Sequence, residues 1–223
     1  MNEILGESIL FSKKPKKLIF LLHGYGDNAT NFIPLAKSLN SNKLEINFFA
    51  PNAPSSVPLY PTGRQWFNIF PNEIHKNKTI EEQKSIIEKD CQDSFIKLQK
   101  YISDLCNLNN LSHKDCFLIG FSQGAMIAYE LGFFEDKIFA GCIMLSGRVL
   151  SKKIYKNNNF VKTPLLIIHG DEDEIIKPSY FTEACEIAKL NNFNSKEYLI
   201  NGVGHTISPK ILELVENFLQ KYM

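Results

Sequence analysis

The sequence predicts an α/β fold, in which helices cover both faces of a mostly parallel central sheet. Short runs of aliphatic residues alternate along the chain with longer stretches of helical periodicity, which is the pattern of βαβ units. Several of these runs are apolar without interruption, as strands buried on both faces should be. Hydrophobic residues make up 44% and charged residues 22% of the chain, which is typical of soluble globular proteins. Together these observations favour a parallel sheet covered by helices.

Six segments are predicted to form the main strands, and they cover residues 18–23, 46–50, 116–120, 141–146, 165–169 and 196–200. A seventh, shorter strand is expected at residues 8–11, on the edge of the sheet. Helical periodicity is found over residues 31–39, 80–107, 123–133, 179–190 and 209–221. In the longest of these helices the apolar residues are spaced mostly by three and four, which gives one apolar stripe.

The sequence also predicts one long irregular segment and a single domain. Residues 51–78, which contain five prolines and the single Trp66, are predicted to be the main irregular segment, and a loop this long is usually functional or mobile. No linker or internal repeat is visible, and a domain takes roughly 150 residues. One domain spanning 1–223 is therefore expected. Only about 18 residues separate Ser146 from the next strand, which is too few for a separate cap domain.

Charge and cysteine content exclude several classes of protein. The 25 basic and 24 acidic residues give a formal charge of +1, without the basic excess of a nucleic-acid-binding protein. No apolar run approaches the roughly 18 residues that a membrane-spanning helix needs. The five cysteines are scattered without a C-x-x-C pair, so neither a disulfide framework nor a metal site is indicated. The amino-terminal residues lack the pattern of a signal peptide, and a cytoplasmic protein is expected.

A motif around Ser122 is the strongest indication of function. Residues 120–124 read Gly-Phe-Ser-Gln-Gly, directly after a predicted strand and directly before a predicted helix. This is the nucleophile-elbow pattern G-x-S-x-G. Its two glycines allow a turn so tight that side chains there would strike the neighbouring backbone. The serine then stands at a helix amino terminus, where backbone N–H groups favour developing negative charge.

A serine nucleophile needs a base, and the base needs an orienting carboxylate. In this architecture the chain order is serine, acid, histidine. An acidic run at 171–174 follows one late strand, and His205 follows the next. Both lie where strands end, which is where open α/β sheets place their sites.

A third segment follows the first buried strand and reads His23-Gly-Tyr-Gly-Asp27. Its small residues would let backbone N–H groups approach a bound oxyanion. His23 and His169 each end a strand and precede a glycine, and we interpret both as structural rather than catalytic.

These motifs resemble the α/β-hydrolase family of bacterial carboxylesterases and acyl-protein thioesterases, also called lysophospholipases. The resemblance runs nearly from end to end: LHGYGD, PNAP, QWFNI, GFSQGA, HGDEDEII and GVGH all match. Two departures from the family pattern are Asn68, where an aspartate is usual, and Ala125, where a second glycine is frequent. Asn68 puts any inherited substrate preference in doubt.

The resemblance implies a serine hydrolase without a cofactor or a metal. It implies Ser122 as the nucleophile, His205 as the base and Asp173 as the orienting acid. It also implies an oxyanion hole formed by the backbone N–H groups of Tyr25 and Gln123. The substrate would be a small ester, a lysolipid or an acyl-protein thioester, and a homodimer is an option that the sequence leaves open.

The aromatic residues of the 51–78 segment have two interpretations. Trp66 and Phe67 are core residues by default, because large aromatic side chains are usually buried. In an open site without a cap, they are also candidates for contact with the acyl chain of a substrate.

Two alternatives from other classes remain. Residues 24–29 also fit the loose dinucleotide fingerprint G-x-G-x-x-A, but the nearest acid, Glu45, stands at the start of the next strand instead of its end. A non-catalytic binding protein of the same fold is the second alternative, although such proteins usually lack a triad residue. Saturable binding of a nicotinamide cofactor would favour the first, and absence of turnover with activated esters would favour the second.

Overall fold

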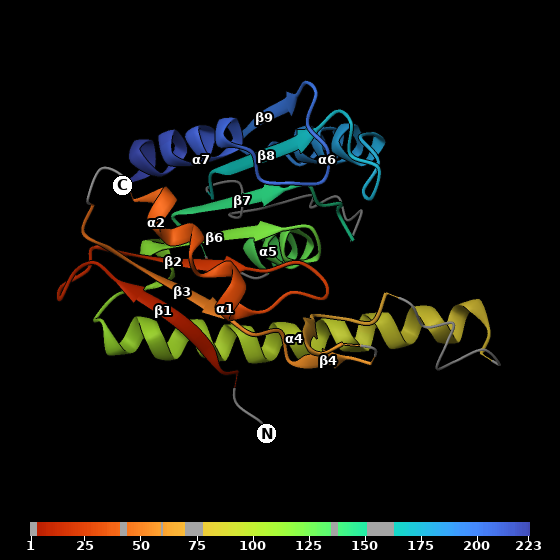
Figure 1. Cartoon of the computed structure of the whole chain (residues 1–223), viewed down its shortest axis with the longest axis horizontal. Helices are drawn as coiled ribbons and strands as arrows, with labels where there is room; N and C mark the ends of the chain where they lie inside the picture. The colour runs from red at the N-terminus through yellow and green to blue at the C-terminus, as the bar shows by residue number, and fades with distance from the viewer. Residues whose placement is uncertain (1–3, 41–43, 59, 70–77, 135–137, 151–162) are drawn as a thin grey trace.

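A computed structural model describes residues 4–40, 44–58, 60–69, 78–134, 138–150 and 163–223. Its central sheet has seven strands in the order β1-β3-β2-β6-β7-β8-β9 (Figure 1). Their bounds are β1 Gly6–Leu10, β2 Lys17–Leu22, β3 Ile46–Pro51, β6 Cys116–Phe121, β7 Gly141–Leu145, β8 Leu165–Gly170 and β9 Ser195–Ile200. Strand β1 pairs antiparallel with β3, and all other neighbouring pairs of this sheet are parallel. The mostly parallel sheet and its edge strand near the amino terminus are therefore confirmed.

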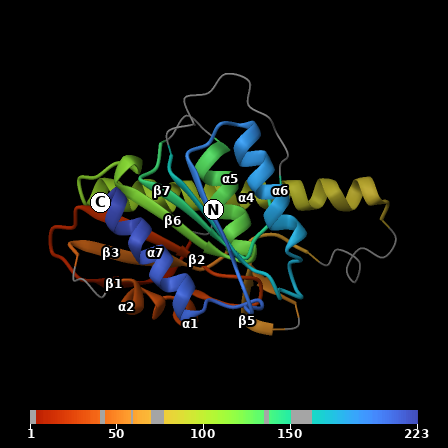
Figure 2. The ribbon, with the colours of Figure 1, turned by 90° about the horizontal axis from the view of Figure 1, so that it is seen from above.

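Helices cover both faces of this sheet, as Figure 2 shows. One face carries α1 (Ala29–Phe32), α2 (Leu35–Leu39) and α7 (Pro209–Tyr222), and the other carries α4 (Ile80–Leu108), α5 (Gln123–Phe134) and α6 (Ser179–Leu190). Alternation along β2 explains the two layers, because successive side chains of a strand point to opposite faces. Ile19 and Leu21 pack in the apolar cluster under α1, α2 and α7. Leu18, Phe20 and Leu22 pack in the cluster under α4, α5 and α6.

Local sequence signals set the helix boundaries. The helix expected at 31–39 is divided into α1 and α2, because Pro34 lies between them and has no backbone N–H to continue the first helix. Helix α4 begins at a capping box. The Glu82 backbone N–H donates to the Thr79 hydroxyl at 3.2 Å, and the Glu82 carboxylate accepts the Thr79 N–H at 2.7 Å.

Part of the 51–78 segment is more regular than the sequence predicts. Strands β4 (Ser55–Val57) and β5 (Tyr60–Gln65) form an antiparallel hairpin. The register shifts within its short ladder, and such a bulged, proline-containing hairpin has no clear alternation of apolar residues to predict it. The hairpin is bound to the loop after β2, because Gly26 N–H donates to Arg64 O at 2.9 Å and Arg64 N–H donates to Asp27 O at 2.8 Å. Residues 70–77 of this segment lie outside the described residues.

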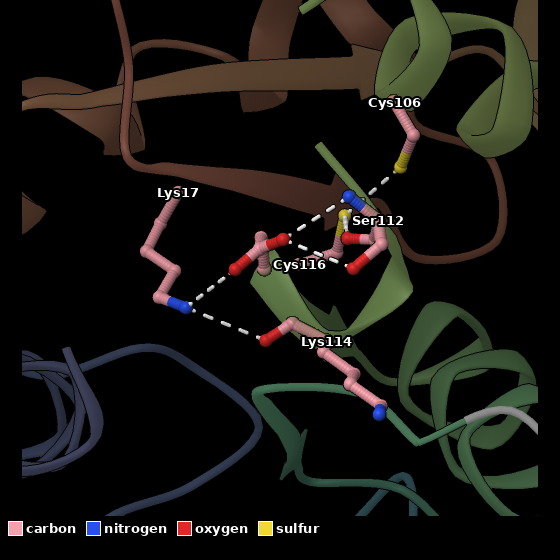
Figure 3. A network of polar contacts seen from close by, with 6 residues as sticks. Lys17, Cys106, Ser112, Lys114 and Cys116 are labelled. Atoms are coloured by element: carbon pink, nitrogen blue, oxygen red, sulfur yellow. Dashed lines mark hydrogen bonds and ion pairs between the residues drawn. The ribbon is translucent and has the colours of Figure 1, made fainter. Parts of the chain in front are cut away.

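A polar network holds the amino-terminal ends of two central strands together (Figure 3). The Lys17 ammonium at the start of β2 lies 2.9 Å from the Asp115 carboxylate and donates to the Lys114 carbonyl at 3.4 Å. Asp115 precedes β6 in the short 3₁₀ helix η1 (His113–Asp115). Beside it, the sulfur atoms of Cys106 and Cys116 lie 3.3 Å apart as free thiols. This network aligns β2 and β6 at the end of the sheet opposite to the candidate site.

Candidate active site

Three loops meet at the edge of the sheet where the parallel strands end. The arrowheads of β6, β7, β8 and β9 point toward this edge in Figure 1. Ser122 directly follows β6, Asp173 lies in the turn after β8, and His205 lies between β9 and α7. Ligands of open α/β sheets bind outside the carboxyl ends of the strands. The three side chains therefore come from the loops that the sequence assigns to them.

Ser122 occupies a tight turn between β6 and α5. Its φ angle is 54°, in the left-handed region that a residue with a side chain rarely adopts. The turn is possible because a side chain at Gly120 would overlap the Gly124 backbone, and one at Gly124 would overlap the Leu22 carbonyl. Ser122 N–H donates to Leu145 O at 2.9 Å, which ties the turn to the neighbouring strand β7. The side chain is partly exposed directly before the first residue of α5.

Asp173 and His205 are in direct contact. His205 Nδ1 lies 2.7 Å from Asp173 Oδ2, and the Asp173 side chain is completely buried. The other oxygen, Oδ1, accepts the backbone N–H groups of Ile175 at 2.9 Å and Ile176 at 2.8 Å. An ionised carboxylate only accepts hydrogen bonds, so neutral His205 donates through Nδ1 and keeps a lone pair on Nε2. Nε2 is thus available to accept a proton.

The His205 ring stands beside the turn that carries the serine. The centroids of the Phe121 and His205 rings are 4.8 Å apart, with 39° between their planes. Phe121 immediately precedes Ser122 in the chain. The imidazole is only 17% exposed, because this aromatic contact covers part of it. The packing places the acid–histidine pair next to the elbow.

The other members of the acidic run do not touch the histidine ring in any hydrogen bond of the described structure. Asp171 Oδ1 accepts the Gly202 N–H at 2.7 Å, while Glu172 and Glu174 are exposed. The Asp171 side chain is thus bonded to the loop that leads to His205, but not to the histidine itself. The reason is that β8 and β9 are neighbouring parallel strands, so the turns that follow them are adjacent.

His169 is a contributor that the sequence interpretation left without a specific role. Its Nε2 lies 2.7 Å from the Ile176 carbonyl oxygen and 3.4 Å from Asp173 Oδ2. Burial lowers the pKa of this imidazole, so the neutral ring donates its Nε2 hydrogen to the carbonyl. His169 thereby fastens the turn that carries Asp173. In the sequence, only its position directly before Gly170, the last residue of β8, indicated that His169 lies near the acidic turn.

The loop after β2 lies against the serine. A side-chain carbon placed on Gly24 would be 3.4 Å from Ser122 Cβ, so the backbone approaches the nucleophile closely here. Tyr25 follows Gly24 in this loop, and Gln123 follows Ser122 at the start of α5. The two residues named as backbone oxyanion donors thus flank one serine.

Trp66 and Phe67 lie in the core. Trp66 is 0% and Phe67 1% exposed, and both belong to the apolar cluster under α4, α5 and α6. This burial leaves their side chains no surface for the expected substrate contact and favours the other interpretation, packing.

A search of the described helices found none with the length and apolar character that a membrane span requires.

The chain is similar in sequence and in fold to proteins named as thioesterases and esterases. The chain is 26% identical over 218 residues to acyl-protein thioesterase 1 homolog 1 of Dictyostelium discoideum, an alignment that covers 91% of this chain and 89% of the relative. It is 28% identical over 224 residues to acyl-protein thioesterase 1 of Candida albicans, covering 92% and 94%. The crystal structure of esterase PE8 has a TM-score of 0.84 and 25% identity, with all of both chains covered.

The similarity extends to a whole family. The carboxylesterase of Bacillus cereus shares the fold with a TM-score of 0.78 at 19% identity, over 99% of this chain and 95% of that one. The α/β-hydrolase fold expected from the sequence is thereby confirmed. Relatives of this kind are hydrolases that act on ester bonds. The phospholipase/carboxylesterase family model matches residues 8–223, and the protein therefore belongs to that family.

Proposed function

We propose that this protein is a serine hydrolase that cleaves carboxylic esters or thioesters through an acyl-enzyme, with Ser122, Asp173 and His205 as its triad. The observation that carries the proposal is the 2.7 Å hydrogen bond between Asp173 and His205, made beside the turn that holds Ser122. A buried carboxylate that fixes Nδ1–H leaves Nε2 as the base, which is the arrangement that activates a serine. The family and its named relatives support the same reaction class.

The reaction would proceed in two halves. Ser122 Oγ attacks the carbonyl carbon while His205 Nε2 takes the hydroxyl proton. The tetrahedral intermediate then collapses, and the alcohol or thiol leaves with the proton that His205 returns. In the second half His205 deprotonates a water molecule, which attacks the acyl-enzyme and releases the carboxylic acid. Asp173 keeps its charge throughout and stabilises the imidazolium.

The developing oxyanion would bind to the backbone N–H groups of Tyr25 and Gln123. Such donors accelerate acyl transfer because they are already aimed at the place where charge develops. The close approach of the Gly24 backbone to Ser122 supports this assignment. No cofactor enters any step. The protein would act as one domain, 1–223, in the cytoplasm, where its five free thiols would persist.

A matched substrate panel tests the reaction class and narrows the substrate. Oxygen esters and thioesters of the same acyl groups, from two to sixteen carbons, are assayed with the wild-type protein and with Ser122→Ala. We expect hydrolysis of activated esters that the variant loses by several orders of magnitude, with short and medium chains preferred. A thioester preference would support the acyl-protein substrate class, because relatives bear the name acyl-protein thioesterase. A folded wild-type protein that turns over none of the panel would contradict the proposal and favour a non-catalytic binding protein.

A further inference from the structure

A buried segment after the β4–β5 hairpin connects the two sides of the candidate oxyanion hole. The indole Nε1–H of Trp66 donates to His23 O at 2.9 Å, and the Trp66 backbone N–H donates to Gln123 Oε1 at 2.9 Å. The Gln123 amide in turn donates through Nε2 to Phe67 O at 2.7 Å. Trp66 is 0% and Gln123 2% exposed, so these bonds are shielded from water. One residue, Trp66, is thus bonded both to the loop after β2 and to the start of α5.

In the loop after β2, which would supply the Tyr25 N–H, hydrogen bonds fix two successive peptide units. The carbonyl of His23 is held by Trp66, and the carbonyl of Gly24 accepts from His23 Nδ1 at 2.8 Å. The Gly24 carbonyl and the Tyr25 N–H belong to the same peptide unit, and no cis peptide occurs among the described residues. The two groups therefore point in opposite directions. Anchoring these carbonyls sets the direction of the Tyr25 N–H.

The His23 ring is itself held in one protonation state. Its Nε2 accepts the Ala53 backbone N–H at 3.1 Å, which requires a lone pair on that nitrogen. Burial lowers the pKa of this histidine, so the ring stays neutral with its hydrogen on Nδ1. The ring centroids of His23 and Trp66 are 5.5 Å apart. The two side chains therefore support the loop as one packed unit.

The start of α5, which would supply the Gln123 N–H, is also held by hydrogen bonds. The Ser122 carbonyl shares a peptide unit with the Gln123 N–H and accepts the Ala125 N–H at 3.0 Å. The Gln123 side chain is clamped at both ends of its amide by the backbone of Trp66 and Phe67. The Trp66 carbonyl accepts a further hydrogen bond from the buried Ser94 hydroxyl of α4. Trp66, whose backbone holds the Gln123 side chain, is thereby anchored to helix α4.

We propose that Trp66 is a positioning residue, whose indole N–H fixes the loop that carries Tyr25 relative to the Gln123 N–H at the start of α5. This inference rests on the proposed function, because it concerns the oxyanion hole of that reaction. Two N–H groups on separate loops stabilise one oxyanion only if their spacing is held, since oxyanion donors act through preorganised geometry. Loss of the indole donor leaves the His23 carbonyl buried without that partner and frees the loop to shift.

The test uses the fact that the chain has one tryptophan. Replacing it with β-(benzothiophen-3-yl)alanine exchanges the indole N–H for sulfur and nearly keeps its shape. Incorporation of 5-fluorotryptophan keeps the N–H and is the matched control. For both proteins kcat and KM are measured on one activated ester, together with the Ki of a trifluoromethyl ketone, whose hemiketal oxyanion would occupy the hole. Circular dichroism confirms that each protein is folded.

We expect the benzothiophene protein to lose about tenfold in kcat at unchanged KM, less than the 10²–10³ that removal of an oxyanion donor costs. The trifluoromethyl ketone should bind more weakly by a similar factor, and the fluorinated control should stay within about twofold of wild type. If the benzothiophene protein does not fold, Trp66→Phe removes the same N–H, with a smaller ring in its place, and is measured in the same way. A folded protein without the indole N–H that keeps kcat and Ki within about twofold would overturn the role of Trp66 alone. If the wild-type protein shows no hydrolysis, or if Ser122→Ala hydrolyses the ester equally well, the proposed function is overturned, and the role of Trp66 with it.

Discussion

At the scale of single residues, the contacts of Asp173 distinguish it from three acidic neighbours of similar chemistry. Its carboxylate is buried and accepts hydrogen bonds from two backbone N–H groups and from His205. Asp171 instead accepts one backbone N–H from Gly202. The side-chain amide of an asparagine can still accept a hydrogen bond from a backbone N–H through its oxygen. It carries no charge, however, and so cannot stabilise a neighbouring imidazolium electrostatically.

Replacing each aspartate by asparagine should therefore have different effects. We expect Asp173→Asn to reduce kcat on an activated ester by a factor on the order of 10²–10⁴, because the charge beside the base is lost. Asp171→Asn should cost less than about tenfold. Circular dichroism of both variants serves as the control for folding. A larger loss for Asp171→Asn would contradict the role of Asp173 as the orienting acid, while the roles of Ser122 and His205 would stand.

The residues that sequence reasoning could assign are those whose chemistry is unusual for their position. A serine between two glycines after a strand, and a histidine and an acid after later strands, are recognisable in the sequence alone. The roles of Trp66 and His169 are different, because they depend on partners far along the chain, such as the carbonyl of His23. A tryptophan that packs and a tryptophan that also donates to a functional loop look the same in a sequence.

At the scale of elements, the elbow between β6 and α5 depends on space that only glycine leaves. A side chain at Gly124 would overlap the Leu22 carbonyl of β2, a strand that is buried in the centre of the sheet. The backbone cannot yield there without disturbing the pairing of β2 with β6. By contrast, a side-chain carbon at Gly204 would meet nothing closer than 3.6 Å.

Two glycine-to-alanine variants test this difference in packing. Gly124→Ala should lower the free energy of unfolding by about 3 kcal/mol or more, at the upper end of what overpacking costs, or prevent folding. Gly204→Ala should change it by less than about 1 kcal/mol. Urea unfolding followed by circular dichroism measures both. Equal stabilities for the two variants would mean that the elbow can widen and that its geometry is not rigid.

The elements themselves could largely be predicted, because buried parallel strands and amphipathic helices have strong periodic patterns. The bounds of α6 agree fully with the expected 179–190. The hairpin β4–β5 could not be predicted, since β4 has only 3 residues and the register of the pair shifts. Its order comes from backbone bonds to the loop after β2, and such bonds leave no trace in side-chain patterns.

At the scale of the whole molecule, two buried histidines link stability to pH. Burial lowers the pKa of His23 and of His169 below the ordinary value. An unfolded chain binds protons at these positions below about pH 6.5, whereas the native protein resists protonation there. The unfolded state then binds more protons, so stability falls as the pH drops. Above about pH 6.5 the histidines are neutral in both states and this effect disappears.

We therefore expect the midpoint of urea unfolding to be lower at pH 5.5 than at pH 7.5. The loss is at most about 1.4 kcal/mol for each histidine per pH unit. Ordinary carboxyl groups titrate near pH 4, below this window. Midpoints at pH 7.5 and 8.5 should agree closely, which is the control. Equal or greater stability at pH 5.5 would contradict the view that both rings are held neutral in the folded protein.

In the proposed reaction, Ser122 is a nucleophile activated by its neighbours at the carboxyl edge of the sheet. The most direct measurement is covalent labelling by a fluorophosphonate, with the site mapped by mass spectrometry and the remaining esterase activity followed in the same samples. We expect one adduct per chain, on Ser122, in proportion to the activity lost. Ser122→Ala, shown to be folded, should take up no label. An adduct on another residue, or equal labelling of the wild type and Ser122→Ala, would contradict the role of Ser122 as the nucleophile.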